Sequence, residues 1–282
     1  MIQKQNYRSS SAVSVALKYF ILIVFALWTL LSLVSCFITS FKNTDEYNST
    51  SVMVLPRVWY FRNFAEAFKL ADMGRAFINS AVVLLFVLGG SIIIGSQLAY
   101  VLNRFKFPGN ALIRRLFLFA TLLPGIAMQV AVYEIMGRLG FINHLYGYII
   151  MQMGTDVISI YIFIQFMENI SSSLDESAII DGASYHTIYW RIILPLLKPA
   201  VVTSMILKGV STYNEYYCAG LYLQSLNIRT VAISLYTFTG PMGSQYNLIC
   251  AGVLISLFPS LVIFLLCQKQ IYTGITAGAV KG

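Results

Sequence analysis

The sequence predicts an all-α polytopic membrane protein with six transmembrane helices and a polar cytoplasmic loop between spans four and five. Hydrophobic residues make up 58% of the 282 positions and charged residues only 11%, whereas a soluble domain is roughly 25% charged. The apolar residues gather in charge-poor windows of about 20 residues, the length that crosses the hydrocarbon core of a bilayer. One segment between two such windows is polar and bears acidic residues, which is typical of a solvated loop.

Six windows predict the spans in chain order. They cover residues 19–40, 77–102, 116–133, 145–167, 200–223 and 248–267. Pro124 interrupts the third window and Asp156 lies in the fourth. The fifth window holds two charges, Lys208 and Glu215. We expect each window to form one membrane-spanning helix, broken in the third by the proline.

The positions of lysine and arginine predict the orientation, because cytoplasmic loops carry an excess of these residues. The segment between spans two and three decides the orientation, since it holds basic residues and no acidic residue. These bases are Arg104, Lys106, Arg114 and Arg115. Both termini and the loop 168–199 then lie in the cytoplasm, and the net charge of +8 reflects topology rather than nucleic-acid binding. The expected parts are an N-terminal segment 1–18, a six-span domain 19–268 and a C-terminal tail 269–282.

The loop 168–199 carries the signals of two short helices. Ser173 and Glu176 fit a capping box, in which the serine accepts a hydrogen bond from an amide of the first turn and the glutamate reaches back to the cap. A first helix should therefore begin at Leu174. Gly182 should end it, because glycine adopts the left-handed backbone of helix ends without steric strain.

A second helix should follow, with Ser184 as its cap and Pro195 as its end, because proline cannot donate to a helix and its ring clashes with the preceding turn. Its apolar residues recur at helical spacing and form one stripe. They are Tyr185, Ile188, Tyr189, Ile192 and Ile193. Two short helices at an angle, with small residues at the bend and a one-sided apolar face, suit a knob that docks in a groove of another protein.

From Glu176 to Pro199 the chain reads ESAIIDGASYHTIYWRIILPLLKP, which resembles the cytoplasmic coupling loop of bacterial ABC importer permeases. That loop has the pattern E-A-A, then D-G-A, then I-x-L-P and a second proline. The matching residues are Glu176, Ala178, Asp181, Gly182, Ala183, Ile192, Leu194, Pro195 and Pro199. Ser177 stands where alanine is usual and keeps a small side chain there. The ending GITAGAVKG, residues 274–282, resembles the maltose and maltodextrin branch of these permeases.

The resemblance implies a permease subunit of an ATP-driven importer in the bacterial cytoplasmic (inner) membrane, which moves a sugar or oligosaccharide by alternating access. Its implied partners are a second homologous permease in a heterodimer, ATPase subunits that use ATP and Mg, and an extracellular sugar-binding protein. The loop 168–199 would be the coupling loop, where the ATPases act on the spans. The chain itself would catalyse no reaction and would hold no cofactor or metal.

The polar residues of the fifth span form the predicted substrate path. A charge at the centre of a membrane is unfavourable by about 2.5 kcal/mol or more, so such charges normally face a cavity, a partner or each other. Lys208 and Glu215 should share one helix face. The tyrosines around Glu215 place aromatic faces beside a polar group, which suits a sugar ring with apolar faces and hydroxyls at its rim. The path residues are Lys208, Tyr213, Asn214, Glu215, Tyr216 and Tyr217. The alternative is a buried network of Lys208 and Glu215 that holds the span against the second permease.

Other functions lack their motifs in this sequence. No lysine follows a glycine, so a Walker A motif is absent. The four cysteines form no C-x-x-C pair, and His144 and His186 lie in separate segments. Two other functions stay open: an ion-coupled secondary transporter that works alone, and a membrane sensor or scaffold subunit that uses the loop only for docking. Asp156 either lines the pathway or marks an outer helix end.

Overall fold

The computed structural model describes residues 12–123, 125–154, 156–240 and 243–279. The chain folds into two compact units, and each unit combines two separate segments of the sequence. The first unit comprises Met1–Leu70 and Phe238–Ile255, and the second comprises Ala71–Thr237 and Ser256–Gly282. Nearly all described elements are helices, as the sequence predicts.

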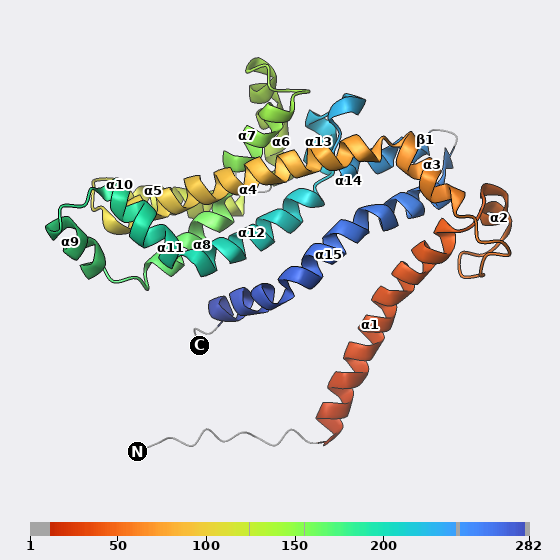
Figure 1. Cartoon of the computed structure of the whole chain (residues 1–282), viewed down its shortest axis with the longest axis horizontal. Coiled ribbons are helices and arrows are strands. Elements are labelled where there is room, and N and C mark those ends of the chain that lie inside the picture. Colours follow the sequence, from red (N-terminus) through yellow and green to blue (C-terminus); the bar gives the residue numbers. More distant parts are fainter. Residues whose placement is uncertain (1–11, 124, 155, 241–242, 280–282) are drawn as a thin grey trace. The chain divides into compact units, whose positions relative to one another are not determined.

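The first unit contains α1, two short helices, a hairpin and the start of the last helix (Figure 1). The bounds are α1 Ala12–Ser40, α2 Thr44–Ser49, α3 Arg62–Leu70, β1 Thr239–Gly240, β2 Gly243–Ser244 and α15 Tyr246–Ala279. The two strands pair antiparallel, Thr239 with Ser244 and Gly240 with Gly243. Most large apolar side chains of α1 are exposed, which is typical of a helix that faces lipid or another membrane protein.

The chain that follows α1 is tied back to the end of this helix. Asn63 Nδ2 donates hydrogen bonds to the carbonyl oxygens of Ser40, at 2.8 Å, and Lys42, at 2.7 Å. The ring of Phe41 packs edge-to-face against Trp59, with centroids 4.9 Å apart. These contacts bury polar backbone groups together with their partners, so the loop after α1 is a fixed structure.

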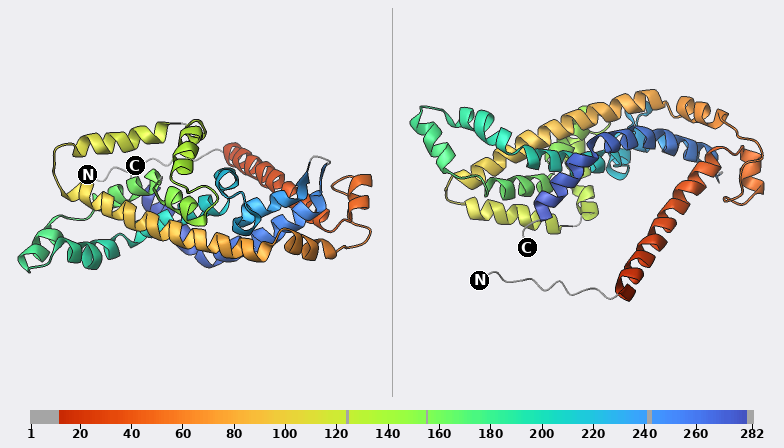
Figure 2. Two further views of the ribbon diagram at one scale, coloured as in Figure 1. Left: turned by 90° about the horizontal axis from the view of Figure 1, so that it is seen from above. Right: turned by 60° about the horizontal axis from the view of Figure 1, so that its bottom comes forward.

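The second unit is built along α4, which α8 and α12 accompany in each view (Figures 1 and 2). Its longer helices are α4 Met73–Arg104, α5 Asn110–Leu122, α6 Gly125–Arg138, α7 Leu145–Gly154, α8 Val157–Met167 and α12 Lys198–Tyr213. The shorter elements are α9 Ser173–Ile180, α10 Tyr185–Ile188, η1 Tyr189–Ile193, α11 Leu194–Leu196, α13 Tyr217–Tyr222, η2 Leu226–Ile228, α14 Val231–Ser234 and η3 Leu235–Phe238, whose last residue belongs to the first unit.

Six membrane spans are consistent with these helices. Ser14–Ser40, Met73–Arg104 and Tyr246–Leu266 are each long and apolar enough to cross a bilayer alone. Three further pairs of helices, each bent by more than 40°, pass the same test together. They are Asn110–Leu122 with Gly125–Arg138, Leu145–Gly154 with Val157–Met167, and Tyr185–Leu196 with Lys198–Tyr213. Pro124, expected to break the third span, lies outside the described residues, although the helices on either side of it end and begin there.

The fifth predicted span, 200 to about 223, begins within two residues of the observed helix but is wrong at its C-terminal end. Its helix α12 begins at Lys198 and already stops at Tyr213. The chain then breaks before the short α13. A window of hydropathy cannot detect this break, because the residues on both sides of it are equally apolar.

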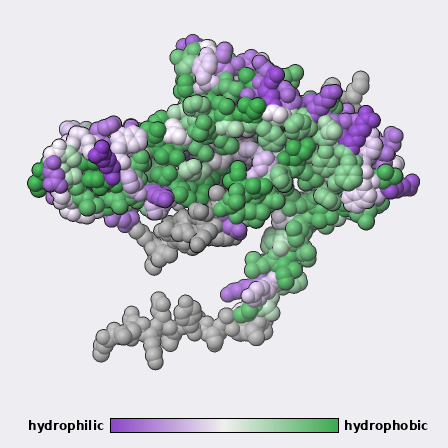
Figure 3. All heavy atoms as spheres, in the orientation of Figure 1, coloured by the Kyte–Doolittle hydropathy of each residue, from purple (hydrophilic) through white to green (hydrophobic). Residues whose placement is uncertain are grey.

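Small residues on α4 allow its neighbours to approach closely. A Cβ at Gly95 would lie 3.2 Å from the ring of Phe163 on α8, and a Cβ at Gly90 would overlap Met153 on α7. Small residues at helix interfaces are typical of membrane proteins, in which packing drives association. Figure 3 shows hydrophobic side chains along the helices of this unit and more hydrophilic ones around α9 and α10.

Candidate functional site

The first helix of the loop 168–199, α9, does not begin with the predicted cap. The described chain shows no capping box between Ser173 and Glu176. Ser171 Oγ instead accepts a hydrogen bond from the Ser173 amide at 3.2 Å. The prediction was wrong because the N-cap position belongs to Ser172, which has φ −66° and ψ −21° and makes no side-chain capping bond.

The end of α9 is confirmed at Gly182, which has φ +82°. The Gly182 amide donates to Ile179 O and the Ala183 amide donates to Ala178 O, both at 2.9 Å. This pair of bonds is a Schellman motif, which satisfies two carbonyl groups at a helix end. A Cβ at Gly182 would meet no atom within 4 Å. Glycine is therefore favoured by the backbone angle and not by a lack of space.

The second helix has the predicted cap, because Ser184 Oγ accepts a hydrogen bond from the Thr187 amide at 3.3 Å. It does not end at Pro195. α10 continues as the π-helical turn η1, and α11 follows with Pro195 in its first turn.

The π-turn explains why proline is tolerated at this place. The Leu194 amide bonds to Tyr189 O, five residues back, so the wider turn displaces the carbonyl group that a proline ring would otherwise meet. The helix ends instead at Leu197, and α12 leaves at an angle of 72°.

The apolar stripe of the second helix packs inward. Ile188 and Ile193 are fully buried, and Tyr189 is 4% exposed. They belong to one hydrophobic core with residues of α4 and α8. The prediction that this stripe serves docking was therefore wrong for these three residues, because they hold the loop onto the transmembrane helices, whereas Tyr185 of the same stripe is exposed.

Several other apolar side chains of the loop are exposed. Ile180, at the end of α9, is 85% exposed, although isoleucine is usually buried in proteins. Other large exposed apolar residues of the loop are Leu174, Ile179, Tyr185 and Trp190. An exposed apolar patch with a polar surround is typical of a protein interface.

A buried ion pair ties α9 to the end of α4. Arg104 Nε lies 2.9 Å from Asp175 Oδ2, and both side chains are largely buried. Tyr100 Oη donates to Asp175 Oδ1 at 3.1 Å. Arg104 Nη2 also donates to the carbonyl oxygen of Ile170 at 2.8 Å. A buried charge left without its partner is strongly unfavourable, so these contacts make α9 and α4 one mechanical piece.

A second tie lies one helical turn back along α4. Ser96 Oγ and Tyr189 Oη are 2.7 Å apart, in a buried hydrogen bond. The ring of Tyr100 packs against that of Tyr189, with centroids 5.9 Å apart. Both helices of the loop are thus fastened to the same face of α4, where residues recur at a spacing of about four.

The predicted coupling residues fall into two groups in the structure. Exposed residues are Glu176, Ser177, Asp181, Gly182, Pro195 and Pro199. Buried or half-buried residues are Ala178, Ala183, Ile192 and Leu194. The first group forms the outer surface of the loop, and the second group packs against the transmembrane helices.

The predicted substrate path has a different geometry from the one expected. Lys208 and Glu215 do not share a helix face, because α12 ends between them at Tyr213. Glu215 Oε1 accepts a hydrogen bond from the Cys218 amide at 2.9 Å and so caps α13. Asn214 Nδ2 donates to Val210 O at 2.9 Å. The two polar side chains satisfy backbone groups at the break, which favours ending the helix there.

The tyrosines of the path have separate partners. Tyr213 Oη donates to the Ser256 carbonyl oxygen on α15 at 2.8 Å. Tyr216 stacks on Tyr236 with ring centroids 6.0 Å apart. Tyr217 is exposed. The structure therefore does not gather these rings into one sugar-binding face around Glu215.

Lys208 has two carboxylates, those of Asp156 and Glu215, within electrostatic range. The described residues nevertheless show no ion pair of Lys208 within 4.0 Å. Asp156 Oδ1 accepts a hydrogen bond from the Ser159 amide and caps α8. Its other oxygen is buried without a hydrogen-bond partner in the described chain. Asp156 thus marks a helix end inside the fourth span rather than at the outer end.

The sequence interpretation missed Asp175, Tyr100 and Arg104. Arg104 carries a topology signal in the sequence, and Asp175 stands beside Glu176, the residue that matches the motif. One signal was present, since Tyr100 and Arg104 lie four residues apart and hence on one helix face. Their partner could not be found, because Asp175 lies 75 positions from Tyr100.

Comparisons with known proteins agree with this architecture. Residues 91–272 match the family of binding-protein-dependent transport system inner membrane components. The chain is 30% identical to the probable starch degradation products transport system permease protein AmyC of Thermoanaerobacterium thermosulfurigenes, over 86% of this chain and 89% of that protein.

Two further likenesses cover most of the chain. It is 31% identical to the melibiose/raffinose/stachyose import permease protein MelC of Bacillus subtilis, over 86% of this chain and 88% of the relative. A bacterial ABC transporter involved in the import of the acidic polysaccharide alginate has a chain of the same fold, with a TM-score of 0.80 and 22% identity over 94% of this chain and 99% of that one. This protein belongs to the family of inner membrane components of binding-protein-dependent transport systems.

Proposed function

We propose that this chain is the permease subunit of an ATP-driven importer that moves a sugar or oligosaccharide across the cytoplasmic membrane by alternating access. Family membership supports the transport role, and relatives named as permeases for melibiose, raffinose and starch products support the substrate class. The chain catalyses no reaction. ATP and Mg are bound by separate ATPase subunits.

The observation that carries this proposal is the joint between the coupling loop and α4. The loop presents an exposed outer surface with Glu176 and Ile180. Its inner side is fixed to α4 through Asp175 and Arg104. A push on the outer surface is therefore transmitted to a long transmembrane helix without passing through a flexible linker, as a coupling element requires.

The proposed assembly contains a second homologous permease, a pair of ATPases on the cytoplasmic side and an extracellular sugar-binding protein. Arg104 ends α4, where Asp175 of the coupling loop is attached, and Lys106, Arg114 and Arg115 follow in the connection and on α5. This placement supports a cytoplasmic position for the loop and for both termini. The exposed apolar residues of α1 support contact with lipid or with the second permease.

Uptake by proteoliposomes that contain the assembled complex tests the proposed function. We expect uptake of labelled melibiose, raffinose or maltose to need the binding protein and internal ATP. Uptake that follows a proton or sodium gradient without ATP would instead establish a secondary transporter. No uptake, together with normal binding of the ATPases, would favour a sensor or scaffold subunit.

A matched pair of charge reversals tests the docking surface. Glu176→Lys should weaken copurification of the ATPases more than Glu168→Lys, because Glu176 is exposed in the first turn of α9, where a negative charge is favoured by about 0.3–1 kcal/mol. Glu168 precedes α9, and its Oε1 lies 3.8 Å from Arg114 Nη1. Equal losses in the two variants would show a general acidic surface and no specific docking at α9.

A further inference from the structure

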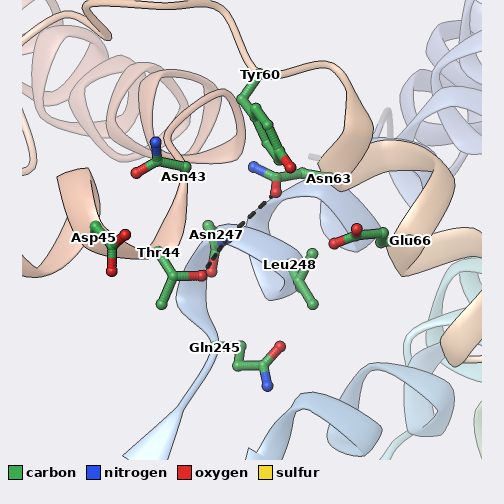
Figure 4. A pocket seen from close by; sticks show the side chains of 9 residues that line it. All are labelled: Asn43, Thr44, Asp45, Tyr60, Asn63, Glu66, Gln245, Asn247 and Leu248. Atoms are coloured by element: carbon green, nitrogen blue, oxygen red, sulfur yellow. Dashed lines mark hydrogen bonds between the residues drawn. The ribbon is translucent and has the colours of Figure 1, made fainter.

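A polar cavity lies in the first unit, separate from the coupling loop and from the fifth span. It has a volume of about 320 Å³ and opens among the chain after α1, the start of α3 and the start of α15 (Figure 4). Four carboxamides, two carboxylates, two hydroxyls and one leucine line it. The residues are Asn43, Thr44, Asp45, Tyr60, Asn63, Glu66, Gln245, Asn247 and Leu248.

The hydrogen bonds at the cavity fix the orientation of Asn247. The amide nitrogen of Asn63 is used by the carbonyls of Ser40 and Lys42. Asn63 Oδ1 therefore faces Asn247 and accepts from its Nδ2 at 3.3 Å, while Thr44 Oγ1 accepts from the same nitrogen at 3.4 Å. This leaves Asn247 Oδ1 as an acceptor.

Asn247 Oδ1 has no hydrogen-bond partner among the described residues, although the side chain is only 2% exposed. Figure 4 shows Asn247 in the middle of the lining side chains. A buried acceptor without a donor is unfavourable by about 1–3 kcal/mol. The cavity therefore calls for a ligand that brings a hydrogen-bond donor to this oxygen.

The charges of the lining argue against ions as ligands. Asp45 and Glu66 are acidic, and no lining residue is basic, which disfavours an anion. The nearby bases are already engaged, since Arg62 pairs with Glu66 at 2.7 Å and Lys42 Nζ donates to Thr50 and Ser51. The described residues hold no group of three acidic, histidine or cysteine side chains that fits a metal ion.

The mixture of donors and acceptors points to a neutral ligand. A cation offers only donors and would leave carboxamide N–H groups such as those of Gln245 facing it. An apolar ligand would meet mainly polar groups, since Leu248 is the one aliphatic side chain among the lining residues. Hydroxyl groups donate and accept, and they form strong charge-assisted hydrogen bonds with a carboxylate such as Asp45.

We propose that this cavity binds one sugar ring, either a free monosaccharide or the end of an oligosaccharide. Asp45 and Asn247 accept hydrogen bonds from ring hydroxyls, carboxamides donate to them, and the ring of Tyr60 offers an apolar face. The volume lies near the lower end of ligand pockets, about 300–1,000 Å³, so the cavity suits one ring. The proposal rests on the proposed sugar transport and adds a binding site to it.

Sugar binding to the purified complex, in lipid nanodiscs without ATP and without binding protein, tests this site. The probes are melibiose, raffinose, maltose and trehalose, measured by saturation-transfer NMR and by titration. We expect saturable binding of at least one probe. Asp45→Asn should weaken it about tenfold, because a charge-assisted hydrogen bond is replaced by a neutral one. Asp72→Asn is the matched control, since Asp72 is exposed, pairs with Arg75 and lies outside the cavity lining.

The outcomes separate this inference from the proposed function. Absence of binding for all four sugars, or equal affinity of the Asp45→Asn and Asp72→Asn variants, overturns the cavity as a sugar site while ATP-driven uptake by the unaltered complex still stands. Loss of ATP-driven uptake in the unaltered complex overturns the proposed function itself. Asn247→Leu provides a second variant, because it removes the acceptor oxygen at a similar side-chain size. It should weaken binding of the same probe, and unchanged affinity would also overturn the site.

Discussion

Two charged clusters of the second unit differ in how their charges are satisfied. At the coupling loop, Asp175 and Arg104 form a buried ion pair at 2.9 Å. At the predicted substrate path, Lys208 interacts with Asp156 and Glu215 but forms no ion pair within 4.0 Å in the described chain. A charge in a buried ion pair fixes two elements together, whereas a charge without a direct partner remains available to a ligand or another subunit.

The largest expected effect comes from breaking the paired cluster. Asp175→Ala should lower the free energy of unfolding by about 3–5 kcal/mol, because Arg104 is left buried without its carboxylate, and should abolish ATP-driven uptake. Thermal unfolding of the purified complex and uptake by proteoliposomes measure the two effects. The control is Arg138→Ala, which breaks the exposed pair with Glu134 and should change stability by about 0–1 kcal/mol.

A double replacement separates mechanical coupling from folding. Arg104→Met with Asp175→Leu removes both charges together, and it should recover much of the stability. Uptake should stay low while ATP hydrolysis continues, since the polar tie to Tyr100 and Ile170 is lost. Recovery of full uptake in the double variant would show that the pair serves folding alone.

The next effect concerns the bend of the coupling loop. Gly182→Leu should destabilise the protein by roughly 1–2 kcal/mol, because a side chain disfavours the left-handed backbone, and should also reduce uptake and ATPase binding. Gly140→Leu is a matched control, with φ +69° and open space around its Cα like Gly182. Equal losses of uptake in both variants would mean that backbone strain, and not docking, explains the defect.

Substitutions in the cluster of Lys208, Asp156 and Glu215 should reduce transport more than they reduce stability. Glu215→Gln keeps an oxygen that can cap α13 but removes the charge, so the complex should assemble normally and show about tenfold slower uptake. Glu134→Gln, at an exposed pair, is the control. Adding Lys208→Ala distinguishes the two roles: restored uptake supports a Lys208–Glu215 network, and low uptake in a stable complex supports sugar contact.

The smallest effect tests the corrected cap of α9. Ser171→Ala should lower the free energy of unfolding by about 1 kcal/mol, because its hydroxyl accepts a hydrogen bond from the Ser173 amide. Ser173→Ala should have a smaller effect, since its hydroxyl accepts from no amide of the described helix. Denaturation of the two variants in parallel measures the difference. A larger loss for Ser173→Ala would restore the capping box.

Much of the coupling loop could be predicted from the sequence because its signals are local. Gly182 ends α9 and Ser184 caps α10 through atoms only a few residues away. The predicted helix end at Pro195 was wrong, because a π-turn lets the helix continue through the proline. Such a turn depends on packing and not on the local residue types.

The C-terminal end of the fifth span could not be predicted in the same way. Both sides of the break at residues 214–216 are apolar, and the break is satisfied by Glu215 and Asn214, whose side chains replace helical hydrogen bonds. The sequence shows two polar residues there but not whether they face solvent, a ligand or their own backbone.

The sequence by itself determined the membrane class, the six apolar windows and the helix signals within the loop 168–199, because hydrophobic runs and helix ends are set by neighbouring residues. Only the tertiary structure decided which groups become partners. Tyr100 meets Asp175 across 75 positions, and Asn63 meets Asn247 across 184. These pairings matter for stability because a buried polar group cannot bond to water. It needs a hydrogen-bond partner that only the folded chain can supply.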